Sequence, residues 1–265
     1  MRLSWQIGRV AGIGLFLHPT FLILLAAFYF GGGLPMVALG VAAFGCVLLH
    51  ELGHALMARR FGIDTHDITL YPIGGVARLA RLPRAPGAEL LIALAGPAVN
   101  IALALILGTV LALASLADGA LPYELGVFLA ELLWVNVGLA AFNLLPAFPM
   151  DGGRVVRAVL SGLVGRGRAT EVAALLGQGL ALLFGIVSLV TFNPFHIALA
   201  AFIFLAAGWE RKQVRADEDR RRARGEGQGI WTAPPGYHWV SRGGGVWQLA
   251  PIAITVVEPG PRSWR

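Results

Sequence analysis

The sequence predicts an all-α, polytopic membrane protein with about six transmembrane helices and a small interfacial β element. Apolar residues make up 57% of the 265 positions, and charged residues only 14%. The mean hydropathy is +0.71, and a soluble domain of this length does not need so much apolar sequence. The apolar residues also fall into long runs, which short polar or glycine- and proline-rich segments separate. Together these observations exclude an ordinary soluble domain.

The N-terminal part contains the first two expected spans. Residues 1–17 predict a short amphipathic or extended lead-in, and no small-residue cleavage site follows them. A first apolar span runs to about Phe30, and Gly31-Gly-Gly-Leu-Pro35 predicts a tight turn. The second span covers about residues 36–57, and Arg59 with Arg60 places its end at a membrane interface.

The rest of the chain alternates between spans and short connections. Residues 61–87 lack a span, and two short strands are expected there, at 68–71 and 75–79. Further spans are expected at about 88–117, 125–145, 171–190 and 195–208, with a basic loop reaching Arg168 before the fifth. We therefore expect a core at residues 1–209, a charged helix or linker at 210–224, and a tail at 225–265. The tail is rich in glycine, proline and tryptophan, and is either a small β appendage or a mobile segment.

One motif within the second span points to chemistry. His50 and His54 are four residues apart, so on a helix both imidazoles face the same way and reach one metal ion. Glu51 lies beside that face and can act on water without being a ligand, as in the H-E-x-x-H pattern of zinc hydrolases. A solvated surface cluster fits poorly, because a glutamate inside an apolar run is costly unless it is functional.

The third metal ligand is expected to be Asp151. It follows Pro146 and Pro149, which break the end of the fourth span, and such broken backbone is tolerated only inside protein or beside a water-filled cavity. By itself an aspartate there would suit a helix cap, and the H-E-x-x-H motif on the same side favours a metal ligand. The other histidines are expected to be interfacial or core residues: His18, His66, His196 and His238.

The positive charges predict the orientation. All 21 lysines and arginines fall in the termini and in the connections on one side of the expected spans, and the opposite turns contain none. The positive-inside rule therefore places both termini and the metal motif toward the cytoplasm, in a multi-pass protein of the cell membrane. The net charge of +6 is explained in this way without nucleic acid as a partner.

These motifs resemble the site-2 protease family of intramembrane zinc metalloproteases. The resemblance rests on His50-Glu-Leu-Gly-His54 and on the run from Asn143 through Asp151 to Arg154, with further matches at residues 71–77 and 95–100. It covers about residues 1–209. It implies one zinc ion per chain on His50, His54 and Asp151, with Glu51 as general base. It also implies regulated intramembrane proteolysis of membrane-protein substrates that carry a transmembrane helix, within the lipid bilayer.

Substrate binding is expected at two places. Asn143 resembles a family asparagine that hydrogen-bonds the substrate or the oxyanion, and an interhelical hydrogen bond is an equally good interpretation. Gly74, Gly75, Val76 and Ala77 are expected to offer an open strand edge to an extended substrate, with an ordinary interfacial hairpin as the alternative. Asn100 is interpreted as a helix–helix contact.

Two other functional classes are alternatives to a protease. An ion-binding transporter would also use intramembrane Glu, His and Asp, but the chain lacks internal repeats and has the second motif. A non-proteolytic membrane scaffold would be expected to have lost Glu51, which is present. The substrate's identity, a need for a prior cut and the oligomeric state do not follow from the sequence.

Overall fold

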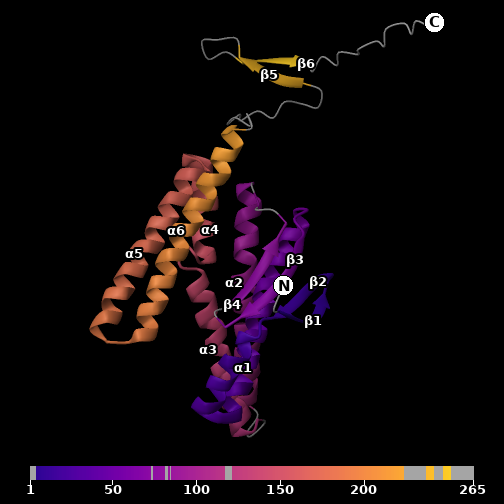
Figure 1. Cartoon of the computed structure of the whole chain (residues 1–265). Helices are drawn as coiled ribbons and strands as arrows, with labels where there is room; N and C mark the ends of the chain where they lie inside the picture. Colours follow the sequence, from indigo (N-terminus) through magenta and orange to yellow (C-terminus); the bar gives the residue numbers. More distant parts are fainter. Residues whose placement is uncertain are drawn as a thin grey trace, which may run out of the picture. The chain divides into compact units, whose positions relative to one another are not determined.

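The computed structural model describes residues 4–72, 74–80, 83, 85–116, 121–223, 237–241 and 247–251. The chain divides into two units, Met1–Ala216 and Asp217–Arg265. The first unit contains the predicted metal motif and the helices around it, and Figure 1 shows its elements. In the second unit, β5 (Tyr237–Ser241) pairs antiparallel with β6 (Trp247–Pro251), so a small hairpin is present in the tail. The domain boundaries expected at 209 and 224 remain predictions.

Helix α1 (Thr20–Arg60) reverses direction at Gly33. The rings of Phe21 and Phe44 have their centroids only 4.7 Å apart, whereas in one straight helix these residues would lie about 35 Å apart. Gly33 has φ 67° and ψ −157°, a backbone conformation that glycine adopts readily. The predicted turn at residues 31–35 is therefore confined to Gly33, and the two apolar segments expected on either side of it correspond to the two arms of α1.

Five further helices begin in the first unit: α2 (Pro86–Leu116), α3 (Tyr123–Asn143), α4 (Asp151–Val164), α5 (Arg166–Val190) and α6 (Pro194–Ala223). Within the described residues, α1, α2, α3 and α5 are long and apolar enough to cross a membrane. The apolar part of α6 ends at Glu210, about 24 Å from the start of the helix, and is shorter than the hydrocarbon core. The protein is thus a mostly helical membrane protein.

A four-stranded sheet covers the metal-bearing arm of α1. Its strands are β1 (Trp5–Val10), β2 (Ile13–Leu17), β3 (Thr65–Tyr71) and β4 (Gly74–Leu79), in that order across the sheet. The pair β2 and β3 is parallel, and the two outer pairs are antiparallel. Ile13, Leu15 and Ile68 form a buried cluster with Ala55 of α1. The N-terminal lead-in is therefore extended and joins the predicted strands in one sheet.

The expected basic loop after Asp151 is wrong, because residues 151–164 form helix α4. Two glycines and several arginines favoured a loop in the sequence. In the structure, however, Gly152 and Gly153 are buried at the start of α4, and Arg157 is only 1% exposed. The side chain of Arg157 is therefore part of the protein interior rather than of a solvated connection.

Candidate metal centre

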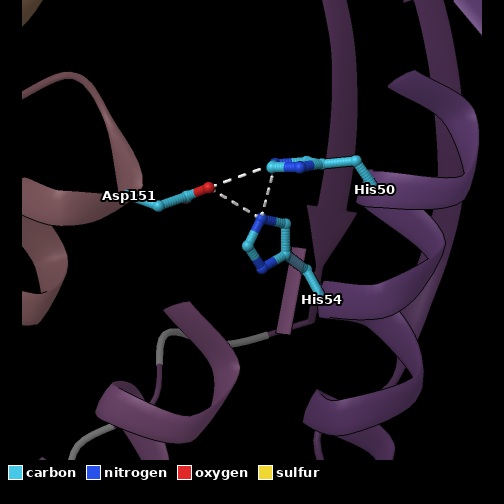
Figure 2. Close-up of side chains that lie close together, drawn as sticks. All are labelled: His50, His54 and Asp151. Carbon is cyan, nitrogen blue, oxygen red and sulfur yellow. Dashed lines mark hydrogen bonds and ion pairs between the residues drawn. The ribbon is translucent and has the colours of Figure 1, made fainter. Parts of the chain in front are cut away.

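Three side chains from two helices converge beside the sheet. His50 and His54 lie on one face of α1, and Asp151 begins α4. The Oδ2 atom of Asp151 is 3.1 Å from Nε2 of His50 and 2.9 Å from Nε2 of His54, and the two Nε2 atoms are 3.0 Å apart. Figure 2 shows the two imidazoles and the carboxylate pointing at one another. All three residues are buried, with exposures of 5%, 5% and 8%.

Hydrogen bonds on the far side of each ring fix its tautomer. Nδ1 of His50 lies 2.5 Å from Oδ1 of Asn100, and Nδ1 of His54 lies 2.7 Å from the carbonyl oxygen of Ile92. Both partners are acceptors, so Nδ1 carries the proton in each neutral imidazole. Each Nε2 therefore presents a lone pair to the centre, as a metal-ligating histidine does.

The donor set and its spacing fit a zinc ion. Two neutral imidazoles and one carboxylate direct only lone pairs at a common point, and a cation is what such a set binds. Donors about 2.05 Å from a tetrahedral zinc ion lie ~3.3 Å from one another, close to the 2.9–3.1 Å observed. Three protein ligands leave the fourth position open for water or substrate.

Gly96 of α2 makes room for the centre. A Cβ atom at this position would lie 2.3 Å from Nε2 of His54 and 2.7 Å from Nε2 of His50. Any other residue would therefore collide with both imidazoles. Sequence reasoning did not single out Gly96, although residues 95–100 were part of the family resemblance.

Asn100 does more than the helix–helix contact expected of it. Its Oδ1 accepts from His50, and its Nδ2 donates to Oδ1 of Asn136 on α3, at 3.0 Å. Asn136 in turn donates to Sγ of Cys46 at 3.3 Å and to the carbonyl of Leu132 at 2.9 Å. Both asparagines are fully buried. This chain of hydrogen bonds orients the His50 ring. The feature of the sequence that indicates such a role is an amide side chain inside an apolar span.

The segment before α4 holds Asp151 in place. The amide nitrogen of Phe148 donates to the carbonyl of Ala173 on α5 at 3.2 Å. Burial alone would raise the pKa of the Asp151 carboxyl, but the positive charge of Arg154 is among the causes that hold that pKa well below its usual range. The carboxylate form, which a metal ligand requires, is thus the favoured one.

Glu51 is half-buried beside the centre, and strand β4 lies against it. A Cβ atom at Gly75 would lie 2.6 Å from Cγ and 3.4 Å from Oε1 of Glu51. β4 is the last strand in the order of the sheet, and Val76 is exposed. Gly75 is thus close to the Glu51 side chain, and Gly74, Val76 and Ala77 are its neighbours in the same short strand.

Asn143 makes a hydrogen bond within its own helix, not the interhelical hydrogen bond that was one interpretation of it. Its Nδ2 donates to the carbonyl of Leu139, one turn earlier in its own helix, at 3.0 Å. The side chain is half-buried at the C-terminal end of α3, just before the segment that leads to Asp151.

This fold and this centre define a helical membrane protein with a His–His–Asp metal site. The model of peptidase family M50 matches residues 38–117 and 113–186, a region that contains all three ligands and Glu51. The chain therefore belongs to peptidase family M50.

Two similar proteins come from Methanocaldococcus jannaschii. The zinc metalloprotease MJ0392 is 34% identical over 221 residues, which are 82% of this chain and 63% of that protein. The solved structure described as a site-2 protease from the same organism is 34% identical, with a TM-score of 0.60 over 78% of this chain and 95% of that one. This chain thus spans less than two thirds of the length of MJ0392.

Proposed function

We propose that this protein is an intramembrane zinc metalloprotease, which hydrolyses peptide bonds in or near the transmembrane segments of membrane proteins. The observation that carries this proposal is the convergence of His50, His54 and Asp151 beside Glu51 within apolar helices. The family match and the site-2 protease likeness agree with it. Regulated intramembrane proteolysis is the process that such an enzyme would serve.

The residues of the site have distinct roles in this proposal. His50, His54 and Asp151 hold one zinc ion, which supplies a water of lowered pKa and polarises the scissile carbonyl when it is bound. Glu51 accepts a proton from the attacking water on its carboxylate and then gives it to the leaving amine nitrogen. Asn100 and Ile92 keep the two imidazoles oriented during this cycle. The Asn143 amide binds the substrate backbone or the developing oxyanion.

A substrate helix must be opened before its backbone can reach this centre. Its peptide groups are hydrogen-bonded internally, and exposing them in lipid costs several kcal/mol each. The edge of β4 supplies replacement partners if the substrate adds to the sheet as an extended strand. Two features support this role: β4 ends the sheet, and Gly75 brings its backbone against Glu51. Gly74 to Ala77 would then bind the substrate next to the general base.

The proposal includes six membrane segments with a cytoplasmic active site. The two arms of α1, together with α2, α3, α5 and the apolar part of α6, would supply the six segments. The charge distribution supports the orientation, since Arg59 and Arg60 end α1 and the charged part of α6 follows Glu210. Both chain termini then lie on the cytoplasmic side.

The full chain in proteoliposomes, supplied with single-span membrane peptides, tests this function. We expect cleavage that a zinc chelator abolishes and added zinc restores. His54→Ala and Asp151→Ala should lose both the metal and the cleavage, while His196→Ala, whose ring packs on Phe184, should retain both. Full zinc content in either ligand variant would refute the site. Metal-dependent ion flux without cleavage would instead favour the transporter class.

A further inference from the structure

Four charged side chains form a network around a buried central pair, Arg157 and Glu89. Nε and Nη2 of Arg157 lie 2.6 Å and 2.5 Å from Oε1 of Glu89, and Nη1 of Arg157 lies 2.7 Å from Oε1 of Glu210. Nη1 of Arg166 lies 2.9 Å from Oε2 of Glu89. The side chains of Arg157 and Glu89 are only 1% and 2% exposed. The two arginines and the two glutamates of these ion pairs balance one another in charge.

The central pair joins the two helices that shape the metal centre. Glu89 lies on α2 one turn before Ile92, whose carbonyl accepts from His54. Arg157 lies on α4 six residues after Asp151, and its guanidinium stacks over the Phe148 ring at 4.8 Å. The contact between Glu89 and Arg157 therefore ties α4, which begins with Asp151, to the part of α2 whose carbonyl accepts from His54.

Stability alone does not account for this pair. Removing two charges from water carries a large desolvation cost, and well-packed apolar residues in their place often give a protein that is as stable or more stable. A planar guanidinium held by two carboxylates, by contrast, fixes distance and direction in a way that apolar packing does not. What the pair provides beyond apolar packing is therefore defined geometry between α2 and α4.

We propose that Glu89 and Arg157 are positioning residues, which set the geometry of the His54 and Asp151 ligands. Glu210 and Arg166 complete the network by binding the free atoms of the central pair, so that α5 and α6 are tied to the same point. An effect of these residues on catalysis rests on the proposed protease function, whereas their effect on metal geometry is independent of it.

Cobalt substitution of the purified full chain tests this proposal, because the visible spectrum of Co²⁺ reports ligand geometry without any turnover. Two variants are needed. Arg157→Lys keeps the charge but loses the planar fork, and Glu89→Leu with Arg157→Met replaces the pair by apolar residues of similar size. Arg215→Gln is the matched control, since it removes an exposed arginine–glutamate pair between α6 and α5.

We expect both variants to shift the Co²⁺ spectrum and to weaken zinc binding by about 10- to 100-fold in chelator competition, as loss of a ligand's supporting contacts does. Arg157→Lys should also lower kcat about tenfold with KM little changed, and the Arg215→Gln control should behave like the unchanged protein. A wild-type spectrum and zinc affinity in Arg157→Lys would overturn the proposal, whether or not the double variant folds. A folded, fully active double variant with an unaltered spectrum would also overturn it. Metal binding without cleavage by the unchanged protein would count against the protease function and would leave the spectral test intact.

Discussion

Gly96 of α2 faces His54 of α1 so closely that a Cβ atom on the glycine would lie 2.3 Å from Nε2 of the imidazole. The contact is possible because the two helices approach at a second glycine as well. A Cβ atom at Gly53 would lie 2.9 Å from the carbonyl oxygen of Ala95. The same approach brings Asn100 and Ile92 within hydrogen-bonding distance of the two rings. The metal centre therefore depends on the close packing of α1 and α2.

Gly96→Ala should abolish tight zinc binding. The added methyl group would have to displace one or both imidazoles, and a zinc site tolerates ligand displacements of only about 0.2 Å. Elemental analysis of the purified variant should show little metal. Gly108→Ala on the same helix is the control, because its Cβ would meet its nearest neighbour at 3.4 Å. A Gly96→Ala protein with one zinc ion per chain would contradict this account of the packing.

Asn100→Ala should weaken zinc binding by about 10- to 100-fold while leaving all three ligands present. The His50 ring would lose the acceptor for its Nδ1 proton and with it a fixed orientation. Asn136 would also lose a partner inside the apolar helices. Chelator competition measures the change. Thr109→Val removes a hydroxyl from an exposed part of α2 and should leave the affinity unchanged; equal affinities in the two variants would show that Asn100 does not support the metal.

The shared face of His50 and His54 follows from local sequence, whereas the contacts that support the three ligands mostly do not. Helix geometry alone puts His50 and His54 on one face, and the prolines before Asp151 indicate a break in the chain. The partners of Asn100 depend instead on which faces of α1, α2 and α3 pack together. The spacing of residues within α2 does not specify that packing. Likewise, the parallel pairing of β2 with β3 joins strands almost 50 residues apart. No turn signal specifies such a pairing.

The burial of Arg157 was missed for a different reason. Counting positive charges assigns every arginine near a membrane to a solvated connection, and this rule places the chain correctly relative to the bilayer in most proteins. It does not reveal which arginines find buried carboxylates. Here Glu89 and Glu210, which are 68 and 53 residues away in the sequence, enclose the guanidinium. An amphipathic pattern over residues 151–164 was the available signal for α4.

Glu51→Gln should keep zinc but lose most proteolysis. The amide has nearly the shape of the carboxylate but cannot accept and return a proton, and such acid–base assistance is worth roughly 10²–10⁴ in rate. Residual cleavage at or below the percent level, with full metal content, is the expected result. Rates close to those of the unchanged protein would show that another group is the base.

Gly75→Ala should slow cleavage about tenfold, by analogy with other displaced catalytic groups, and leave the zinc content unchanged. The new methyl group would lie 2.6 Å from Cγ of Glu51, so either the glutamate or the strand must move. Gly8→Ala on β1, where a Cβ has open space, is the control. Comparison of kcat values at equal zinc content measures the effect. If the two variants cleave equally fast, β4 does not determine the placement of Glu51.

Cleavage should fall in the cytoplasmic half of a substrate's transmembrane helix. In the proposed orientation, His54 near the end of α1 and Asp151 at the start of α4 lie on that side, next to the sheet. Substrates with Gly, Pro or Asn near the cut should be favoured, because their helices open at lower cost.

Proline at Val76 or at Ala77 removes a backbone donor from β4. Backbone N–H groups of successive residues point to opposite sides of a strand. One of these variants should therefore weaken substrate binding, while the other should disturb the pairing of β4 with β3. Mass spectrometry of the products from a set of membrane peptides locates the cuts. Cuts clustered in the outer half, or rates that respond neither to helix breakers nor to either proline, would rule out this mode of substrate binding.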